Sequence, residues 1–151
     1  MTPAERRTRA CQDHLRDGPA DAVVCFPSTN LQYLSGFVED PGERHLLLFV
    51  PAIGDPVFLV PELYDQQVRE ASWVADVRTW TDGDDPRAAV ADVAADLGLA
   101  GGHLLVDDTM WARFTQDLRA VLPDATFGLA SEVLADLRVR KDDAELDALR
   151  R

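Results

Sequence analysis

The sequence predicts an α/β domain of three layers, in which a mixed sheet of about six strands is covered by helices on both faces. Short β-rich runs alternate with helical patterns along the whole chain. One pair of apolar runs is separated by only a short Gly-containing connection, which predicts a hairpin. With 151 residues, the chain is long enough to bury roughly 70 % of its unfolded surface, so its core needs no disulfide or metal.

The first quarter of the chain predicts a helix, a strand and a short helix. Pro3–Asp17 begins with a proline near the helix N-terminus and is followed by Gly18-Pro19, which ends it. Asp21–Ser28 is a compact β-branched run and predicts a buried strand. Asn30–Phe37 has room for one or two helical turns, and the segment Glu39–Arg44, "EDPGER", predicts a loop.

The predicted hairpin follows this loop. Its strands are His45–Pro51 and Asp55–Pro61, and each closes at its proline because proline cannot donate to a strand ladder. Glu62–Ala71 predicts a helix, with Leu63 and Val68 expected on its inner side.

A second helix–strand series fills the middle of the chain. Ala75–Trp80 predicts a strand, and Asp85 is placed to cap the helix that Pro86 opens. The apolar positions of this helix follow the spacing i, i+3, i+4 and i+7, which predicts one inward stripe ended by Gly98. The stripe consists of Val90, Val93, Ala94 and Leu97.

The last third predicts two further strands and two helices. Gly102–Asp108 is a strand, and Thr109 is expected to cap a helix that carries Phe114 and Leu118 and ends at Pro123. A short strand is predicted at 125–129, and Ser131 opens another helix. The segment 141–151 has no Gly or Pro and spaces its leucines at i and i+3, so it predicts the start of a helix that continues into a further domain.

The composition restricts the class of partner. A net charge of −12 argues against nucleic acid and against an anionic membrane surface, because their phosphates would be repelled. The longest apolar stretch, Leu46–Ile53, contains proline and is far shorter than the ~18 residues that span a bilayer. Cys11 and Cys25 are expected to be free thiols in a reducing cytoplasm. The excess of 20 Asp over 7 Glu is compatible with a salt-adapted source.

Sequence motifs for chemistry are scarce. There is no glycine-rich phosphate loop, no G-x-S-x-G and no H-E-x-x-H. The three histidines have no second histidine at metal-ligand spacing, and "DGDD" at 82–85 predicts a turn and a cap better than a calcium loop. Asp107 and Asp108 end a strand, where α/β proteins place functional carboxylates, but acids there also suit the entry to a helix.

Five segments in order resemble the amino-terminal domain of the Xaa-Pro dipeptidase, aminopeptidase P and creatinase family. They are "NLQYLSGF", "ER" before "LLLFVPAIGDPVFLVPEL", "VRTWTDGDDP", "LLVDDTMWARFTQDLRAVLPDATF" and "LRVRKDDAELDALR". The resemblance implies that residues 1–138 form the creatinase/prolidase-type domain. Residues 139–151 would begin the linker helix to a C-terminal pita-bread catalytic domain that this sequence does not include.

The resemblance also implies where the chemistry lies. In the family, two Asp, one His and two Glu of the catalytic domain hold two divalent metal ions, which suits Mn, Co, Fe or Zn. No residue of this chain is expected to bind a metal or to be catalytic. The domain would shape substrate access and subunit contacts in a homodimer that hydrolyses short Xaa-Pro peptides in the cytoplasm.

The substrate-proximal candidates come from two loops. In creatinase, an aromatic residue and an arginine of the first loop contact the substrate carboxylate, and the corresponding stretch here is 37–45. The candidates are Phe37, Glu39, Asp40, Arg44 and His45, with Trp80 and Asp82 as a second lip of the entrance. For Arg44, an ion pair with Glu43 or Asp40 is an alternative, and for Trp80, a role as cover of the sheet edge.

Two other functions stay open at this point. A creatinase-like amidinohydrolase would share this domain, and so would a pseudo-peptidase whose pita-bread domain serves as a binding module. Both are separated from a peptidase by the presence or absence of the metal ligands in the catalytic domain.

Overall fold

The computed structural model describes residues 1–139, 146, 149 and 150. Most of the helix predicted over 141–151 therefore lies outside the described residues, and the division of the chain at 138/139 stays a prediction. The strands are β1 (Ala22–Cys25), β2 (Leu47–Pro51), β3 (Val57–Pro61), β4 (Asp76–Trp80), β5 (His103–Val106) and β6 (Thr126–Leu129). The helices are α1 (Pro3–Arg16), α2 (Thr29–Ser35), α3 (Asp65–Ala71), α4 (Pro86–Asp96), α5 (Ala112–Val121) and α6 (Ser131–Val139), with a 3-10 turn at Glu62–Tyr64.

The six strands form one mixed sheet in the order β4-β3-β2-β1-β5-β6. β2 pairs antiparallel with both β1 and β3, whereas the other neighbours are parallel. Five strands therefore run in one direction and β2 in the other. As a result, the start of β2 lies at the edge where its neighbours end.

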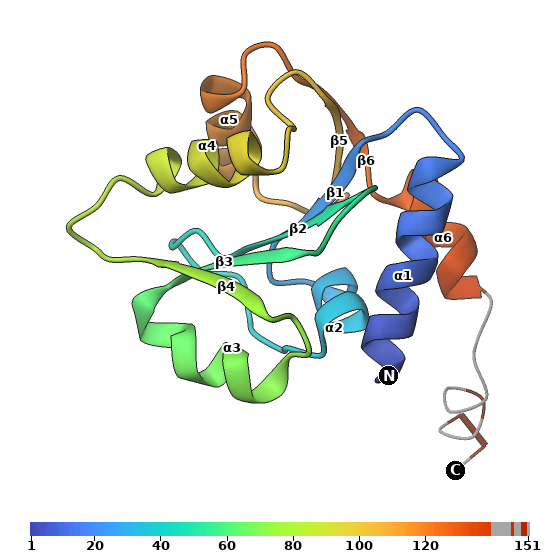
Figure 1. Ribbon diagram of the computed structural model, residues 1–151. Coiled ribbons are helices and arrows are strands. Elements are labelled where there is room, and N and C mark those ends of the chain that lie inside the picture. The colour runs from blue at the N-terminus through green and yellow to red at the C-terminus, as the bar shows by residue number, and fades with distance from the viewer. Residues whose placement is uncertain (140–145, 147–148, 151) are drawn as a thin grey trace.

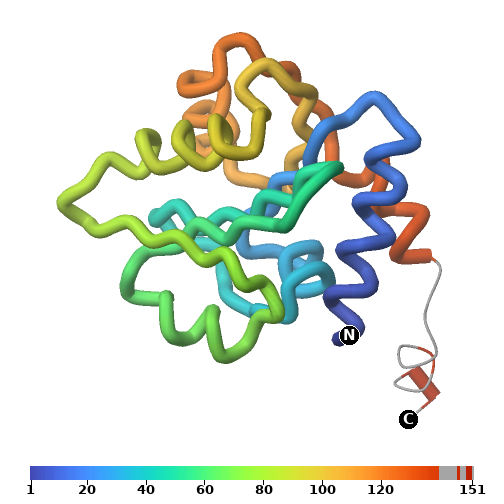
Figure 2. Tube along the Cα trace, viewed as in Figure 1, coloured from blue at the N-terminus to red at the C-terminus, as the bar shows by residue number. Residues whose placement is uncertain are grey.

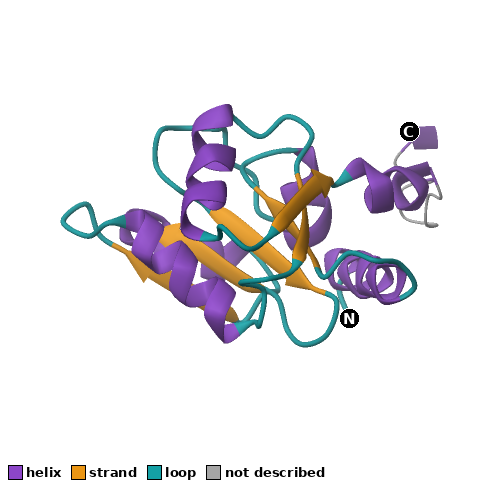
Figure 3. Ribbon diagram, turned by 90° about the horizontal axis from the view of Figure 1, so that it is seen from above, coloured by secondary structure: helices purple, strands orange, loops and turns teal. Residues whose placement is uncertain are grey.

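Helices cover both faces of the sheet (Figure 3). One face packs against α1, α2, α3 and α6, and the other against α4 and α5. Alternate side chains of β1 pack into the two layers. Val23 and Cys25 pack on the first face, and Ala22 and Val24 pack on the second. This two-sided burial explains why the strands are continuous apolar runs.

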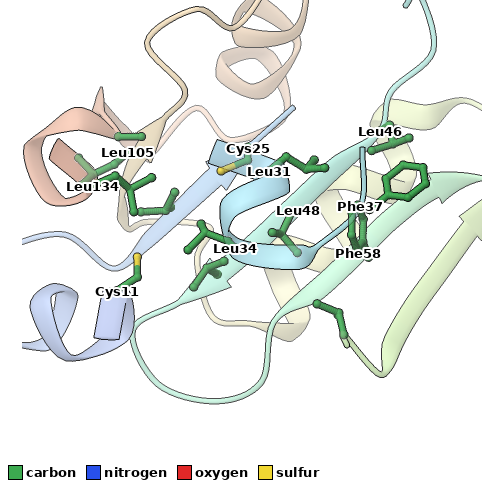
Figure 4. Packing of buried hydrophobic residues seen from close by; sticks show 14 of the residues in the cluster. Cys11, Cys25, Leu31, Leu34, Phe37, Leu46, Leu48, Phe58, Leu105 and Leu134 are labelled. Atoms are coloured by element: carbon green, nitrogen blue, oxygen red, sulfur yellow. The ribbon is translucent and has the colours of Figure 1, made fainter. Parts of the chain in front are cut away.

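The first layer has α2 as its central element (Figure 4). Leu31 and Leu34 of this helix are fully buried. Ser28 caps the helix by accepting a hydrogen bond from the Leu31 N–H, and Gly36 ends it with φ 86°. A side chain at position 36 would be strained and would lie 3.2 Å from the Ala71 carbonyl oxygen, which explains the glycine.

Most predicted elements are confirmed, and two local predictions are wrong. Leu63 is 70 % exposed instead of facing inward, because the α-helix begins only at Asp65 and the residues before it form a 3-10 turn. Thr109 does not cap the next helix, since α5 begins at Ala112 after Trp111. Asp85 does cap α4, accepting a hydrogen bond from the Arg87 N–H.

Within the described part of the chain, no helix combines the length and the apolar character that crossing a membrane requires. Cys11 and Cys25 are free and buried. Burial raises the pKa of the Cys11 thiol to about 12 and that of Cys25 well above its ordinary value. Neither thiol is therefore a reactive nucleophile at neutral pH.

Candidate functional site

The candidate site is the edge of the sheet where the parallel strands end. The loop before β2 and the loop after β4 emerge on the same side of the molecule (Figure 2). They are joined by Arg44 and Asp82, which lie 38 residues apart. Nε of Arg44 donates to Oδ1 of Asp82 over 3.0 Å and Nη2 donates to Oδ2 over 2.9 Å. The two loops singled out from the sequence are thus joined by this ion pair. We call the exposed surface formed by Glu39, Asp40, Arg44 and Asp82 the rim.

The Arg44–Asp82 pair is exposed and has a well-defined geometry. The Arg44 side chain is 49 % exposed and that of Asp82 71 %. The hydrogen bonds from Arg44 lower the pKa of the Asp82 carboxyl, and the same contact raises the pKa of Arg44. Both groups are therefore fully charged at neutral pH. Arg44 pairs with Asp82 and not with Glu43 or Asp40, the partners considered from the sequence.

Glu39 and Asp40 lie beside this pair. Together with Arg44, and with Tyr64 of the turn after β3, they line a small cavity of about 60 Å³. The Asp40 N–H donates to Oε1 of Glu39 over 3.0 Å. Their carboxylates make this part of the rim acidic around a single guanidinium.

Phe37, His45 and Trp80, by contrast, are buried in the domain core. Phe37 is 4 % exposed and packs edge-on against Phe58, with ring centroids 6.0 Å apart. His45 and Trp80 are each 6 % exposed. Trp80 therefore covers the sheet, as the alternative interpretation proposed, and its indole does not line an open surface.

His45 and Trp80 hold the two loops together. Nε1 of Trp80 donates to the backbone oxygen of His45 over 2.9 Å. Nε2 of His45 lies 2.8 Å from Oδ2 of Asp117 in α5, and the His45 ring packs edge-on against Phe114 at 4.9 Å. These contacts of His45 hold the backbone next to Arg44 in place.

Sequence reasoning missed Asp117 because 72 residues separate it from His45. It also undervalued Asp107, which is 2 % exposed. The Asp107 carboxylate accepts hydrogen bonds from the Phe26 N–H, Ser28 Oγ and Asn30 Nδ2 over 2.9, 2.8 and 2.7 Å. It joins the end of β5 to the turn that starts α2. Burial raises its pKa, and the three hydrogen bonds partly offset this rise.

A larger hollow of about 660 Å³ lies away from the rim and is lined by residues of α1, α2, the end of α3 and α6. Two guanidinium groups there flank the ring of Tyr33, with Arg7 4.7 Å and Arg138 5.8 Å from its centroid. Arg138 also donates to Oγ1 of Thr29 and Oδ1 of Asn30, which ties α6 to α2. This hollow contains none of the candidate residues.

Among the described residues, no group of three or more His, Cys, Asp or Glu side chains is arranged to hold a metal ion. What the rim offers instead is one oriented guanidinium and several carboxylates. These groups can bind and orient a charged ligand.

Comparison with known proteins agrees with this architecture. Residues 7–140 match the family described as the creatinase/prolidase N-terminal domain. A Xaa-Pro dipeptidase from Lactobacillus delbrueckii subsp. lactis is 27 % identical over 142 residues, which are 93 % of this chain and 39 % of the relative. The crystal structure of dipeptidase PepE from Mycobacterium ulcerans is 34 % identical with a TM-score of 0.86, over 97 % of this chain and 39 % of that one.

The fold also occurs as a separate solved domain. The creatinase/prolidase N-terminal domain of an X-Pro dipeptidase from Streptococcus pyogenes matches over 87 % of this chain and 98 % of its own length, with a TM-score of 0.76 and 21 % identity. The chain spans about two fifths of the length of the curated relatives that it matches. Most of these relatives are named as dipeptidases, and this chain belongs to the creatinase/prolidase N-terminal domain family.

Proposed function

We propose that this chain is the non-catalytic N-terminal domain of a metal-dependent Xaa-Pro peptidase, whose catalytic domain follows it in the full-length protein. The observation that carries this proposal is the uneven coverage of the relatives. Nearly all of this chain aligns with only 39 % of a Xaa-Pro dipeptidase. Bond cleavage and the two divalent metals belong, in this proposal, to the domain beyond the aligned part.

The rim would shape access to that catalytic site. Arg44, Glu39 and Asp40 are exposed or half-exposed charged groups on a loop whose base is fixed by His45. In a homodimer, this rim would face the active site of the partner subunit and bind the free carboxylate of a short peptide. Orienting the substrate and excluding bulk polymer are physical contributions to catalysis that need no reacting group. We place the full-length protein in the cytoplasm.

The first experiment compares two proteins. The full-length protein and residues 1–151 are assayed with Xaa-Pro dipeptides, longer Xaa-Pro peptides and creatine, with and without added Mn²⁺. We expect metal-dependent cleavage of Xaa-Pro bonds by the full-length protein and none by residues 1–151. Cleavage of creatine would favour an amidinohydrolase, and absence of all hydrolysis would favour a binding module. Hydrolysis of a dipeptide by residues 1–151 alone would overturn the proposal.

The second experiment tests the rim in the full-length protein. Arg44→Ala removes the guanidinium and is expected to raise KM for Xaa-Pro substrates about 10-fold or more, with a small change in kcat. Because Arg44 is exposed, the melting temperature of the variant should stay close to that of the wild type. Unchanged kinetics would reject the role of Arg44 while leaving the peptidase assignment intact.

A further inference from the structure

The guanidinium of Arg44 has two edges, and only one of them is occupied. Nε and Nη2 are bonded to the two oxygens of Asp82. For Nη1, the described residues provide no acceptor. A guanidinium has five N–H groups in a fixed planar fork, so Nη1 and the second N–H of Nη2 form a free edge.

The buried residues His45 and Trp80, close to Arg44 and Asp82 in the sequence, hold the backbone of the two loops in place and so restrict the direction of this free edge. His45, the residue after Arg44, is buried against α5, and Trp80, two residues before Asp82, donates to the His45 carbonyl oxygen. The backbones below both members of the ion pair are therefore linked to each other. An exposed arginine is normally free to rotate, but two parallel hydrogen bonds to a fixed carboxylate restrict the plane of this one.

Among the residues that line the small cavity, Arg44 is the only cationic one. Glu39, Asp40 and Glu43 line the same cavity as Arg44. The structure gives none of these three carboxylates a hydrogen bond to Arg44, which binds Asp82 across the rim. An anionic ligand that approaches this part of the surface therefore has one cationic group to bind, the guanidinium of Arg44.

We propose that Asp82 is a positioning residue that orients Arg44 so that its free edge binds the terminal carboxylate of a short Xaa-Pro peptide. This inference rests on the proposed function and extends it to a residue of the opposite loop. The two oxygens of a substrate carboxylate could accept hydrogen bonds from Nη1 and from the second N–H of Nη2. This would repeat the geometry in which the two oxygens of Asp82 accept from Nε and Nη2. Asp82 itself does not touch the substrate.

A competing arrangement gives the opposite kinetic sign. If the substrate had to displace Asp82 from Arg44, removing the Asp82 charge would tighten substrate binding and lower KM. If Asp82 orients Arg44, removing one of its acceptor oxygens loosens binding and raises KM. The direction of the change in KM therefore decides between the two.

The test uses the full-length protein and two substrates that differ only at the carboxyl end, a Xaa-Pro dipeptide and its C-terminal amide. We expect Asp82→Asn to raise KM for the dipeptide about 3- to 10-fold with kcat nearly unchanged. The same variant should leave KM for the amide unaltered, because the amide has no carboxylate to orient. Asp82→Glu keeps both oxygens and should recover most of the lost affinity. Glu62→Gln is the matched control, since it removes one exposed negative charge next to β3 that forms no hydrogen bond or ion pair with Arg44.

Each other outcome has a defined meaning. A lower KM for Asp82→Asn, or an equal rise for the dipeptide and the amide, would overturn the positioning role. If Arg44→Ala raises KM for the dipeptide and Asp82→Asn does not, this inference fails and the role of Arg44 stands. If wild-type protein does not cleave Xaa-Pro bonds, the proposed function fails and this inference fails with it. Melting curves of residues 1–151 carrying each substitution verify that the fold is retained.

Discussion

Asp82 and Asp107 both follow a parallel strand at the same edge of the sheet, yet their surroundings differ. The Asp82 side chain is 71 % exposed and binds one arginine, whereas Asp107 is 2 % exposed and accepts three hydrogen bonds from the turn after β1. The pKa of the first carboxyl is lowered by its partner, and that of the second is raised by burial. A carboxylate at a strand end thus serves structure where the chain encloses it, and remains available for recognition where it does not.

The largest expected effect concerns the buried carboxylate. Asp107→Ala leaves the Phe26 N–H, Ser28 and Asn30 without their acceptor, so we expect unfolding free energy to fall by about 2–4 kcal/mol. Urea denaturation of residues 1–151 measures this loss. Asp82→Ala is the matched substitution at the exposed position and should lower the denaturation midpoint far less, because solvent screens the exposed Arg44–Asp82 pair. Equal losses for the two variants would invalidate the distinction between them.

A smaller loss is expected from the contact that joins the two loops. Trp80→Phe removes the indole N–H and leaves the His45 carbonyl oxygen without this donor, which should cost about 1–3 kcal/mol of unfolding free energy. Trp111→Phe is the control, because Trp111 is 41 % exposed and stacks on Phe114 from outside. We expect the control to lose clearly less stability. A Trp80→Phe variant as stable as the control would mean that the loops are held by other contacts.

The pKa values of the two carboxyl groups should also deviate from the ordinary value of 3.8 in opposite directions. Carboxyl ¹³C NMR of residues 1–151 should give Asp107 a pKa above this value and Asp82 a pKa below it. Arg44→Ala should return Asp82 towards the ordinary value and leave Asp107 unaffected. Identical titration of Asp82 in wild type and variant would show that the ion pair does not form in solution.

The stability consequences of these shifts have opposite signs. The raised pKa of Asp107 means that its protonated form favours folding, so this contribution is full below the unfolded pKa and is lost as pH rises through the folded pKa. The lowered pKa of Asp82 gives a contribution present above the unfolded pKa and lost as pH falls through the folded one. Stability curves against pH for Asp107→Asn and Asp82→Asn should therefore depart from the wild-type curve on opposite sides.

The smallest expected effect is the dependence of the melting temperature on salt, which acts on exposed charges much more than on buried ones. With a net charge of −12, residues 1–151 should melt a few degrees higher as KCl is raised, because salt screens self-repulsion between exposed carboxylates. Asp107→Ala should show the same salt dependence, since a buried group is screened little. A melting temperature that does not respond to KCl would remove the interpretation of a salt-adapted surface.

The sequence predicts strands and helices well here because each is marked locally. Apolar runs, proline and Asp85 as a cap all act within a few residues of the element they define. Leu63 was misplaced because helical spacing was extended into a 3-10 turn, which has a different period. Thr109 looked like a cap because its side chain is of the right type, but α5 begins only three residues later.

The candidate site could be predicted only in part. The resemblance directed attention to the loop containing Arg44 and to the segment containing Asp82. That these two side chains bind each other depends on sheet order, which places β2 and β4 on either side of β3. Burial of Phe37, His45 and Trp80 likewise depends on packing between distant segments. Hydrophobic periodicity contains no information about such long-range neighbours.

The reversed direction of β2 has a consequence for how this family of domains can vary. Because the two residues that flank the preceding loop, Phe37 after α2 and His45 before β2, are buried in the core, we expect that residues 38–43 can be lengthened or shortened without shifting the register of any strand. A single inverted strand thereby separates the segment that can vary from the scaffold that must stay constant.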